Sequence, residues 1–478
     1  MSNHLIINPG IKSTKFSLKI TTVAGCILLI FLLTSFASKA QVQLLKISDN
    51  NRYFATQNGK PFFWMGDTGW LLFVKLKKEE AIQYLEDRKK KGFNVIQVML
   101  IHDINLGANV YGDSCIINKD VSKPKITPGN NFKIAGEYDY WDNVDFVIDE
   151  AAKRGIYMAL VPIWGGNIKH VNEQQAKMYA TFLANRYKDK SNIIWLNGGD
   201  IKGSEGYTEW MAIGNTLRSI DKNHLIGYHP RGRNSSSEWF HNEPWLDFNM
   251  FQSGHRSYAQ DTSANETTHY GEDNWQYVNA DYKLSPIKPT LDGEPSYEDI
   301  PYGLHNADEP YWQDYEIRRY AYWSVFAGAA GFTYGHNSVM QFYTPGDSGI
   351  SFFPKVKWQP SLNAPGARQM HYLKKLMLSE SYFDRVPAQE IIADNTQTRY
   401  NYILATKGNG YAFAYTYTGI NFQVDFSKLG FTVSKLCWFH PVDGKKQVIK
   451  KSATNGIVEF NPPGEPANGN DWVLILEK

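Results

Sequence analysis

Strand-like and helix-like stretches alternate from residue 61 to residue 378, and this alternation limits the possible folds more than any other feature. Val144, Val147 and Ile148, at helical spacing, show how one face of such a helix becomes apolar. Eight short apolar runs between the helices predict strands at residues 62–66, 93–100, 156–164, 192–197, 225–229, 248–252, 289–291 and 331–335. Repeated strand–helix units imply parallel strands and right-handed crossovers, so eight of them predict a closed (β/α)8 TIM barrel of the α/β class.

The loops of this predicted barrel are unequal in length. Connections from a helix to the next strand are short, and two of them consist of a single residue, Gly92 or Gly155. Connections from a strand to the next helix are long and rich in Gly, Asn, Pro and aromatic residues, as at 102–140, 230–247, 253–273, 295–313 and 336–365. The strand-to-helix loops of such a barrel open on one face, and active sites lie on that face. We therefore expect the functional site there.

The pattern changes after a last predicted helix at 367–378. Short alternating runs follow, separated by turn residues, and they predict strands at 398–407, 411–418, 435–439, 447–450 and 472–476. Such runs are typical of an antiparallel β-sandwich. We therefore expect three segments: an N-terminal segment of residues 1–40, a barrel at 41–380 and a C-terminal sandwich domain at 381–478.

The first forty residues have the features of a cleaved export signal. Three lysines precede an apolar stretch at 20–36, and Ser38-Lys39-Ala40 then provides small residues at the two positions that a signal peptidase reads. We therefore predict export, to the periplasm, the cell surface or the medium of a bacterium. Two alternatives remain. One is a retained membrane anchor, although the run is shorter than the roughly 20 residues of a spanning helix; the other is lipidation of Cys26.

Charge and cysteine content narrow the possible partners and cofactors. Residues 1–40 contain four lysines and no acid, so removing them changes the formal charge from +2 to −2. No strongly basic region remains, so we expect neither a nucleic-acid partner nor a membrane contact beyond a lipid anchor. Cys115 and Cys437 are too few for a disulfide scaffold, and the histidines lack metal-binding spacings such as His-x-His. We expect no metal and no cofactor, and the sequence does not indicate an oligomeric state.

Two acidic residues follow predicted strands in the same local pattern. The run Asn192–Asp200 is an apolar strand followed by two glycines and Asp200, and the run Pro289–Pro295 is a short strand followed by a glycine and Glu294. Hydrolysis of a glycosidic bond requires two carboxyl groups that flank the anomeric carbon. Because the strand ends of a barrel converge on one mouth, we predict that Asp200 and Glu294 are the catalytic pair. The alternative for each acid is an ordinary role, as a helix N-cap or a solvated loop residue.

Other polar or aromatic residues at predicted strand ends are candidates for substrate binding: Asp67, His102, Trp164, His229, Gln252, His255 and His336. Asp67 can instead cap the next helix, each histidine can make a structural hydrogen bond, and Trp164 can be a stacking platform or a core residue. Asp292 is the acid most easily mistaken for Glu294, because it lies two residues before it. Glu205 and Glu298 are interpreted as solvated loop acids.

Four motifs carry a resemblance to a known family: residues 63–68 (Phe-Trp-Met-Gly-Asp-Thr), 92–97 (Gly-Phe-Asn-Val-Ile-Gln), 195–200 (Trp-Leu-Asn-Gly-Gly-Asp) and 292–295 (Asp-Gly-Glu-Pro). With the sandwich that follows, they resemble the apiosidase-like bacterial glycoside hydrolases, family 140. The resemblance implies a retaining (β/α)8 enzyme with Asp200 as acid/base and Glu294 as nucleophile. It also implies action on apiose linkages in the side chains of rhamnogalacturonan II, a plant pectin.

This chain departs from the pattern of the wider superfamily at one place. Strand four usually ends in Asn-Glu there, whereas this chain has Gly199-Asp200, so backbone position must compensate for the shorter acid. The C-terminal part resembles a module with a collagen-binding label, which no feature of this sequence supports.

We therefore predict an exported glycoside hydrolase with an oligosaccharide or polysaccharide substrate, and an apiosidase fits the motifs best. Retention requires carboxyl groups about 5–5.5 Å apart, whereas about 6.5–9.5 Å is typical of inversion. Two alternatives remain. One is another pectic or hemicellulosic glycosidase on the same barrel, of the arabinofuranosidase or rhamnosidase type; the other is a non-catalytic carbohydrate-binding barrel.

Overall fold

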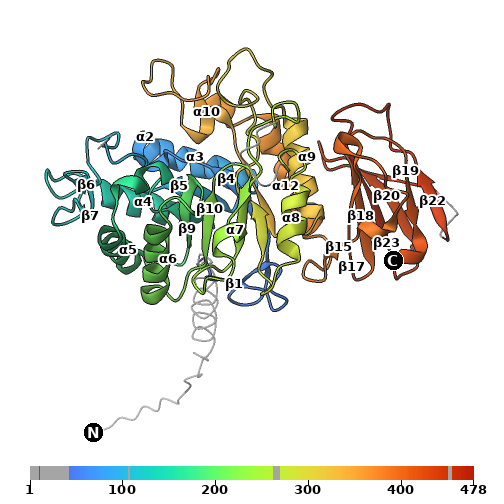
Figure 1. Ribbon diagram of the computed structural model, residues 1–478, viewed down its shortest axis with the longest axis horizontal. Coiled ribbons are helices and arrows are strands. Elements are labelled where there is room, and N and C mark those ends of the chain that lie inside the picture. Colours follow the sequence, from blue (N-terminus) through green and yellow to red (C-terminus); the bar gives the residue numbers. More distant parts are fainter. Residues whose placement is uncertain (1–9, 11–41, 106–107, 262–269, 451–454) are drawn as a thin grey trace, which may run out of the picture. The chain divides into compact units, whose positions relative to one another are not determined.

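The computed structural model describes residue 10 and residues 42–105, 108–261, 270–450 and 455–478. The chain divides into two units, residues 1–41 and residues 42–478, and the second unit holds all of the elements labelled in Figure 1. The export signal predicted at 1–40 lies outside the described residues, apart from residue 10. Within the described ranges, no helix is long and apolar enough to cross a membrane.

Eight parallel strands form a barrel in the second unit. In chain order they are β4 (Trp64–Thr68), β5 (Val95–Met99), β8 (Tyr157–Val161), β9 (Ile193–Ile201), β10 (Ile226–Pro230), β12 (Asn249–Gln252), β13 (Thr290–Asp292) and β14 (Gly331–Tyr334). Their ladder runs from β10 through β9, β8, β5, β4, β14 and β13 to β12. β10 and β12 lie side by side, and the Asp247 N–H donates to the Ile226 carbonyl at 2.8 Å, which closes the ring. The predicted (β/α)8 barrel is confirmed, and each of the eight predicted strands overlaps an observed one.

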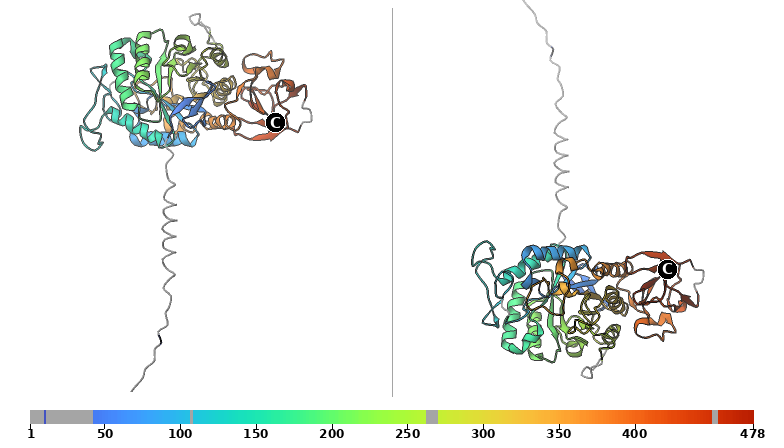
Figure 2. Two further views of the ribbon diagram at one scale, coloured as in Figure 1. Left: turned by 90° about the horizontal axis from the view of Figure 1, so that it is seen from below. Right: turned by 90° about the horizontal axis from the view of Figure 1, so that it is seen from above.

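Helices surround the strands, as the two views of Figure 2 show. The longer ones are α3 (Lys78–Lys90), α4 (Tyr140–Ala152), α5 (Glu173–Tyr187), α6 (Tyr207–Ile220), α8 (Trp275–Tyr282), α9 (Asp314–Phe326) and α12 (Pro365–Met377). Local caps fix where they begin; the Asp139 side chain accepts hydrogen bonds from the N–H groups of Trp141 and Asp142 and so starts α4. The connection between β10 and β12 carries the short α7 (Ser237–Phe240) in place of a long helix.

The two ends of the barrel carry different additions. The strand-to-helix loops contain α2 (Leu72–Lys75), β6 (Ile116–Ile117), β7 (Asp120–Pro124), η2 (Gly165–His170), β11 (Asn234–Ser235), α10 (Asn337–Met340) and α11 (Trp358–Ser361). At the other end, the lower one in Figure 1, β1 (Leu45–Ile47), β2 (Phe54–Thr56) and β3 (Pro61–Phe62) form an antiparallel sheet. Phe54 of this sheet packs edge-on against Phe248, with ring centroids 5.3 Å apart. The sequence analysis did not predict this sheet.

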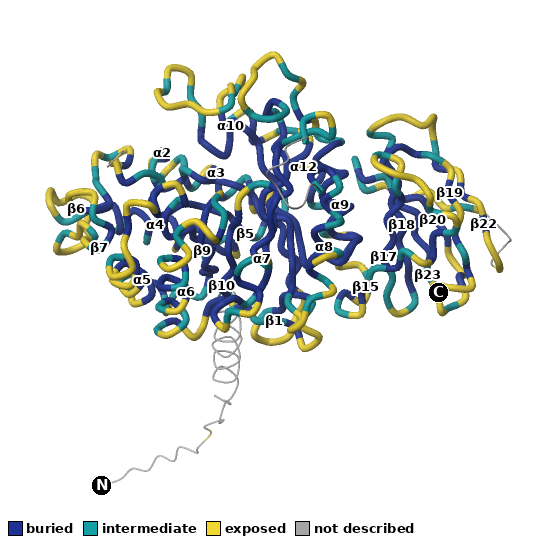
Figure 3. Tube along the Cα trace, in the orientation of Figure 1, coloured by how far each residue is buried: buried dark blue, intermediate teal, exposed yellow. Residues whose placement is uncertain are grey.

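The barrel strands are buried along their length, as Figure 3 shows, except at the end of β9, where Asp200 is exposed. All five residues of β5 and all five of β8 are buried. Helices cover the outer face of these strands, and side chains from the other strands fill the interior. For this reason the strands are continuous apolar runs in the sequence rather than alternating ones.

The C-terminal part is an antiparallel sandwich of two sheets. The larger sheet contains, in spatial order, β15 (Val386–Pro387), β17 (Leu404–Gly408), β18 (Tyr411–Thr416), β23 (Trp472–Glu477), β20 (Lys435–Phe439) and β21 (Lys446–Val448). The smaller sheet contains β16 (Ile392–Ala393), β19 (Phe422–Asp425) and β22 (Ile457–Phe460), and the single turns η3 (Gln389–Ile391), η4 (Arg399–Asn401) and η5 (Phe426–Lys428) lie in the connections. The predicted antiparallel sandwich is confirmed. All five predicted strands belong to the larger sheet, and the smaller sheet was missed.

The larger sheet of the sandwich also packs against α9 of the barrel. Tyr415 of β18 stacks on Tyr322 of α9, with ring centroids 4.8 Å apart. The buried Arg318 guanidinium of α9 binds the buried Asp471 carboxylate at 2.8 Å. Both faces of this sheet are therefore covered, which explains why every residue of β18 is buried.

Candidate active site

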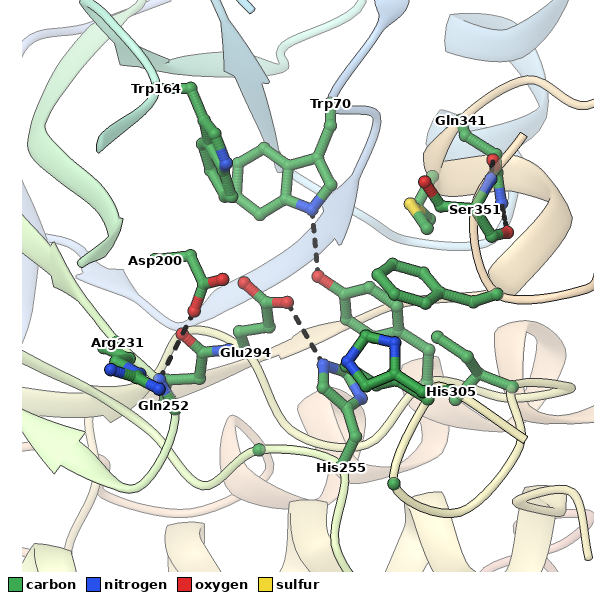
Figure 4. A pocket seen from close by; sticks show the side chains of 18 of the residues that line it. Trp70, Trp164, Asp200, Arg231, Gln252, His255, Glu294, His305, Gln341 and Ser351 are labelled. Carbon is green, nitrogen blue, oxygen red and sulfur yellow. Dashed lines mark hydrogen bonds and ion pairs between the residues drawn. The ribbon is translucent and has the colours of Figure 1, made fainter. Parts of the chain in front are cut away.

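A pocket of about 370 Å³ opens at the carboxyl ends of the barrel strands, where the long loops meet. Asp200 near the end of β9 and Glu294, two residues after β13, both line it (Figure 4). This volume is within the range of small-molecule sites. The structure thus brings together the two acids that the sequence singled out, and their catalytic roles stay predictions at this point.

Asp200 reaches the pocket because β9 bulges next to it. The pairing of β9 with β10 skips Gly199 and Asp200, so these two residues lie outside the ladder. Gly199 has φ +122°, a conformation that residues with a side chain rarely adopt, and a Cβ atom there would lie 2.8 Å from the Trp164 ring. Asp200 itself has φ +49°, in the left-handed region. The glycine before the acid is therefore required by the shape of this bulge.

Glu294 is buried between two histidines. Nε2 of His229 lies 3.1 Å from one carboxylate oxygen, and Nε2 of His255 lies 3.2 Å from the other. The backbone N–H of Asp200 donates to Nδ1 of His229 at 3.3 Å, so a neutral His229 ring carries its proton on Nε2, toward Glu294. His229 therefore connects the backbone of one acid to the carboxylate of the other.

The two carboxyl groups have opposite electrostatic surroundings. Burial raises the pKa of Glu294, but the ring nitrogens of His229 and His255 beside its carboxylate outweigh burial and lower this pKa below its usual value. Desolvation by the surrounding protein raises the pKa of Asp200, and the negative charge of Glu294 raises it further. The Asp200 side chain is nevertheless exposed to the pocket. Glu294 thus favours the ionised form, and Asp200 keeps its proton to a higher pH than an ordinary aspartate.

Several pocket residues escaped the sequence analysis, among them Trp70 and Tyr297. The indole N–H of Trp70 donates to the Tyr297 hydroxyl at 3.0 Å, and burial, followed by the charge of Glu294, raises the pKa of this hydroxyl. The Trp70 ring packs against Trp164 and against His229, each with ring centroids 5.3 Å apart. A signal for both was present, since Trp70 lies two residues after β4 and Tyr297 three residues after Glu294, in loops that the sequence assigned to the functional face.

Five of the seven predicted substrate-binding residues are at this site. His102, Trp164, Gln252 and His255 line the pocket. His229 is fully buried beside Glu294. Burial lowers the pKa of His102, so this ring favours the neutral form and can both donate and accept a hydrogen bond.

The other two, Asp67 and His336, are not among the residues that line the pocket, and this part of the prediction is wrong. The buried Asp67 carboxylate faces α3, where it binds Nε of Arg88 at 2.5 Å and accepts from the Tyr84 hydroxyl at 2.7 Å. Nδ1 of His336 accepts from the Ser338 N–H at 3.1 Å and so caps α10. Both side chains have structural partners.

Two acids close in sequence to the pocket also have structural roles. The Asp292 carboxylate accepts from the Ser253 hydroxyl at 2.7 Å and from the Asn274 amide at 3.0 Å. Glu298 was interpreted as a solvated loop acid, and this is wrong, because it is buried and accepts from the Tyr334 hydroxyl at 2.6 Å. Neither acid is among the residues that line the pocket.

Metal-binding side chains are not grouped in the described part of the chain. The described residues contain no cluster of three or more His, Cys, Asp or Glu side chains that could hold a metal ion. Cys115 and Cys437 are buried and are not joined in a disulfide. The expectation of no metal and no cofactor stays a prediction.

The β9 bulge predicts unequal effects of two glycine substitutions. Gly199→Ala is expected to destabilise the protein by about 1–3 kcal/mol, because alanine adopts φ +122° only with strain and its Cβ would overlap the Trp164 ring. Gly166 is exposed and has open space at its Cβ position, so Gly166→Ala is the matched control, with a change below about 1 kcal/mol. Denaturant unfolding measures both free energies. Equal stabilities of the two variants would contradict this account of the bulge.

Comparisons with known proteins place this site in a family. A model described as "Apiosidase-like, catalytic domain" matches residues 48–384, and one described as "Putative collagen-binding domain of a collagenase" matches residues 386–477. A solved structure described as "Glycoside hydrolase" is 46% identical, with 91% of this chain and 97% of that chain covered and a TM-score of 0.85. A glycoside hydrolase family 5 structure from Bacteroides vulgatus ATCC 8482 is 42% identical, with 92% and 94% covered and a TM-score of 0.85. No curated protein matches.

The pocket and both of its acids lie within the part of the chain that the first model matches. That model covers well over half of the chain, and the two similar structures share more than two fifths of their residues with it over most of its length. The chain therefore belongs to the apiosidase-like family, and it is a glycoside hydrolase.

Proposed function

We propose that this glycoside hydrolase is a retaining enzyme that cleaves apiose linkages in the side chains of rhamnogalacturonan II, a plant pectin. The observation that carries the mechanism is the contrast between two carboxyl groups in one pocket: the pKa of Glu294 is lowered and the pKa of Asp200 is raised. A retaining glycosidase needs such a pair, an ionised nucleophile and a protonated acid, at one anomeric carbon.

The reaction then proceeds in two displacements. In the first, Glu294 attacks the anomeric carbon while Asp200 gives its proton to the departing glycosidic oxygen. A sugar in the pocket displaces water from the exposed Asp200 side chain, which further favours the protonated form. In the second, Asp200 takes a proton from a water molecule, whose oxygen attacks the anomeric carbon and releases Glu294 as a carboxylate.

The charges that line the pocket support an acidic glycan as the substrate. Arg231 and Arg256 line the pocket, and among the described residues neither is bound to a carboxylate. Arginine binds carboxylates in bidentate geometry, so free guanidinium groups beside a sugar site favour uronic acids, which are abundant in pectin. The choice of apiose as the released sugar rests on the motifs at 63–68, 195–200 and 292–295, and an arabinofuranosidase or rhamnosidase activity is the alternative.

Substitution of the two acids tests the mechanism. Glu294→Gln is expected to abolish turnover and to leave the fold intact, because the amide has the size of the acid but cannot form the glycosyl ester. Asp200→Ala is expected to lower kcat/KM for pectic substrates by about 10²–10⁴-fold. The loss should be much smaller for a 4-nitrophenyl glycoside, because nitrophenolate leaves without a proton.

The stereochemistry of the parent enzyme completes this test. NMR of the product formed first should show the anomeric configuration of the substrate, and circular dichroism should show native folding of both variants. An active Glu294→Gln protein, or a product of inverted configuration, would rule out the double displacement.

The raised pKa of Asp200 predicts an alkaline limit of activity. As the pH rises through this pKa, the free enzyme loses the proton that the leaving oxygen needs, so kcat/KM should fall at a higher pH than an ordinary aspartate would give. Because the charge of Glu294 contributes to the shift, NMR titration of Asp200 should give a lower pKa in Glu294→Gln than in the parent protein. An unchanged pKa in that variant would contradict the electrostatic link between the two acids.

Product analysis tests the substrate. Incubation with rhamnogalacturonan II fragments should release apiose, identified by chromatography. Arg256→Ala should raise KM for these acidic fragments about tenfold, equivalent to about 1.4 kcal/mol. The KM for neutral 4-nitrophenyl apioside should stay within about twofold, because no carboxylate is present. Release of arabinose or rhamnose would favour the alternative activity, and equal effects on both substrates would contradict a carboxylate-binding role for Arg256.

A further inference from the structure

Gln252 is a buried amide that faces the pocket without a protein partner. It is the last residue of β12, it lines the pocket, and only 3% of it is exposed. Its Oε1 atom is buried without a hydrogen bond, and its amide nitrogen donates none to any described residue. Burying an amide without hydrogen-bond partners costs free energy. A pocket amide whose oxygen and nitrogen both lack a protein partner therefore indicates a site for a polar ligand.

The position of Gln252 is fixed relative to both acids. Its carbonyl accepts from the Arg233 N–H at 2.6 Å, within the pairing of β11 with β12. Gly254, two residues later, donates its N–H to the Glu294 carbonyl at 3.2 Å. On the other side, Gly232 donates its N–H to the Asp200 carboxylate at 3.4 Å, and a Cβ at Gly232 would lie 3.6 Å from the Gln252 amide nitrogen. Figure 4 shows the Gln252 side chain on the side of the pocket where these two acids lie.

Other amides near the pocket are already occupied. The side chain of Gln341, the second glutamine that lines the pocket, donates to the Ser351 carbonyl at 2.8 Å and accepts from the Ser351 N–H at 2.9 Å. The side chain of Asn197 in β9 donates to the Trp210 carbonyl at 2.8 Å, away from the pocket. Gly199, which stands where the superfamily pattern has an asparagine, cannot be replaced by a side chain without overlap with Trp164. Among the described pocket residues, Gln252 is therefore the amide available to a substrate.

We propose that Gln252 binds the hydroxyl group on the ring carbon next to the anomeric carbon of the sugar that is cleaved. The anomeric carbon has to lie between Asp200 and Glu294, and this hydroxyl is the free hydroxyl group of the sugar nearest to that carbon. Hydrogen bonds to this hydroxyl strengthen in the transition state of glycoside hydrolysis. The inference rests on the proposed function, because it takes attack by Glu294 on the anomeric carbon as given. It assigns the hydrogen bond to this hydroxyl to a residue of β12, because the end of β9 has no room for a side chain that could make it.

A comparison of two substrates tests the proposal. Gln252→Met keeps a similar length and volume but removes both hydrogen-bonding atoms. It is assayed with the 4-nitrophenyl glycoside of the sugar that the parent enzyme releases, and with the 2-deoxy analogue of that glycoside. The variant should lose about 100-fold in kcat/KM on the complete substrate, mostly in kcat, and no more than about twofold on the 2-deoxy substrate. An equal loss on both substrates, or no loss on either, would overturn the proposal.

Two control experiments distinguish a loss of this hydrogen bond from a general loss of activity and from an error in the proposed substrate. Gln341→Met also replaces a pocket glutamine, but its effect should be equal on both substrates, because Gln341 holds the backbone of Ser351. Binding of the released sugar and of its 2-deoxy form to Glu294→Gln, measured by calorimetry with and without Gln252→Met, should show the same preference without turnover. If the enzyme releases a sugar other than apiose, the proposed substrate is wrong, but the comparison made with that sugar still decides the role of Gln252.

Discussion

Two carboxyl groups in one small pocket cannot both be ionised without a large cost, and the donors around each group decide which of them carries the charge. Two histidine ring nitrogens contact the Glu294 carboxylate. Among the described residues, the Asp200 carboxylate accepts one long bond, 3.4 Å, from the Gly232 N–H. The proposed division between a nucleophile and an acid follows from this unequal distribution of donors rather than from the residue types, since both groups are carboxyls.

The donors come from different strand ends, so their geometry depends on the rigidity of the barrel. α9 is central to that rigidity, because it holds the two loops that precede it. Arg319 of α9 binds Glu272 of the loop after β12 at 2.5 Å, with both side chains buried, and Glu316 accepts from Tyr302 of the loop after β13 at 2.6 Å. The sandwich packs on the same helix, and its Tyr400 donates to Glu272 at 3.1 Å. The sandwich thus supports the loops that carry His255 and Tyr297.

The strands of the barrel and the location of both acids could be predicted, because strands buried on both faces are continuous apolar runs and the ends of parallel strands meet at one mouth of the barrel. The direction of a side chain at a strand end could not. Side chains alternate along a strand, and when both faces are buried the apolar pattern does not mark the inner one. Asp67 was therefore assigned to the pocket although it faces Arg88 of α3. The smaller sheet of the sandwich escaped prediction because strands of two to four residues show too little alternation.

The bulge of β9 explains how the shorter aspartate can serve where the superfamily pattern has a glutamate. Gly199 and Asp200 leave the ladder with β10, and the Asp200 side chain lines the pocket. The same bulge brings position 199 against Trp164, so no side chain fits there. Position 199 therefore cannot supply a polar side chain to the pocket. The end of β12 faces the same pocket, and its pairing with β11 holds Gln252 in place. The bulge of β9 therefore leaves no room for a polar side chain at position 199, and the Gln252 side chain at the end of β12 is positioned to make the proposed contact with the sugar instead.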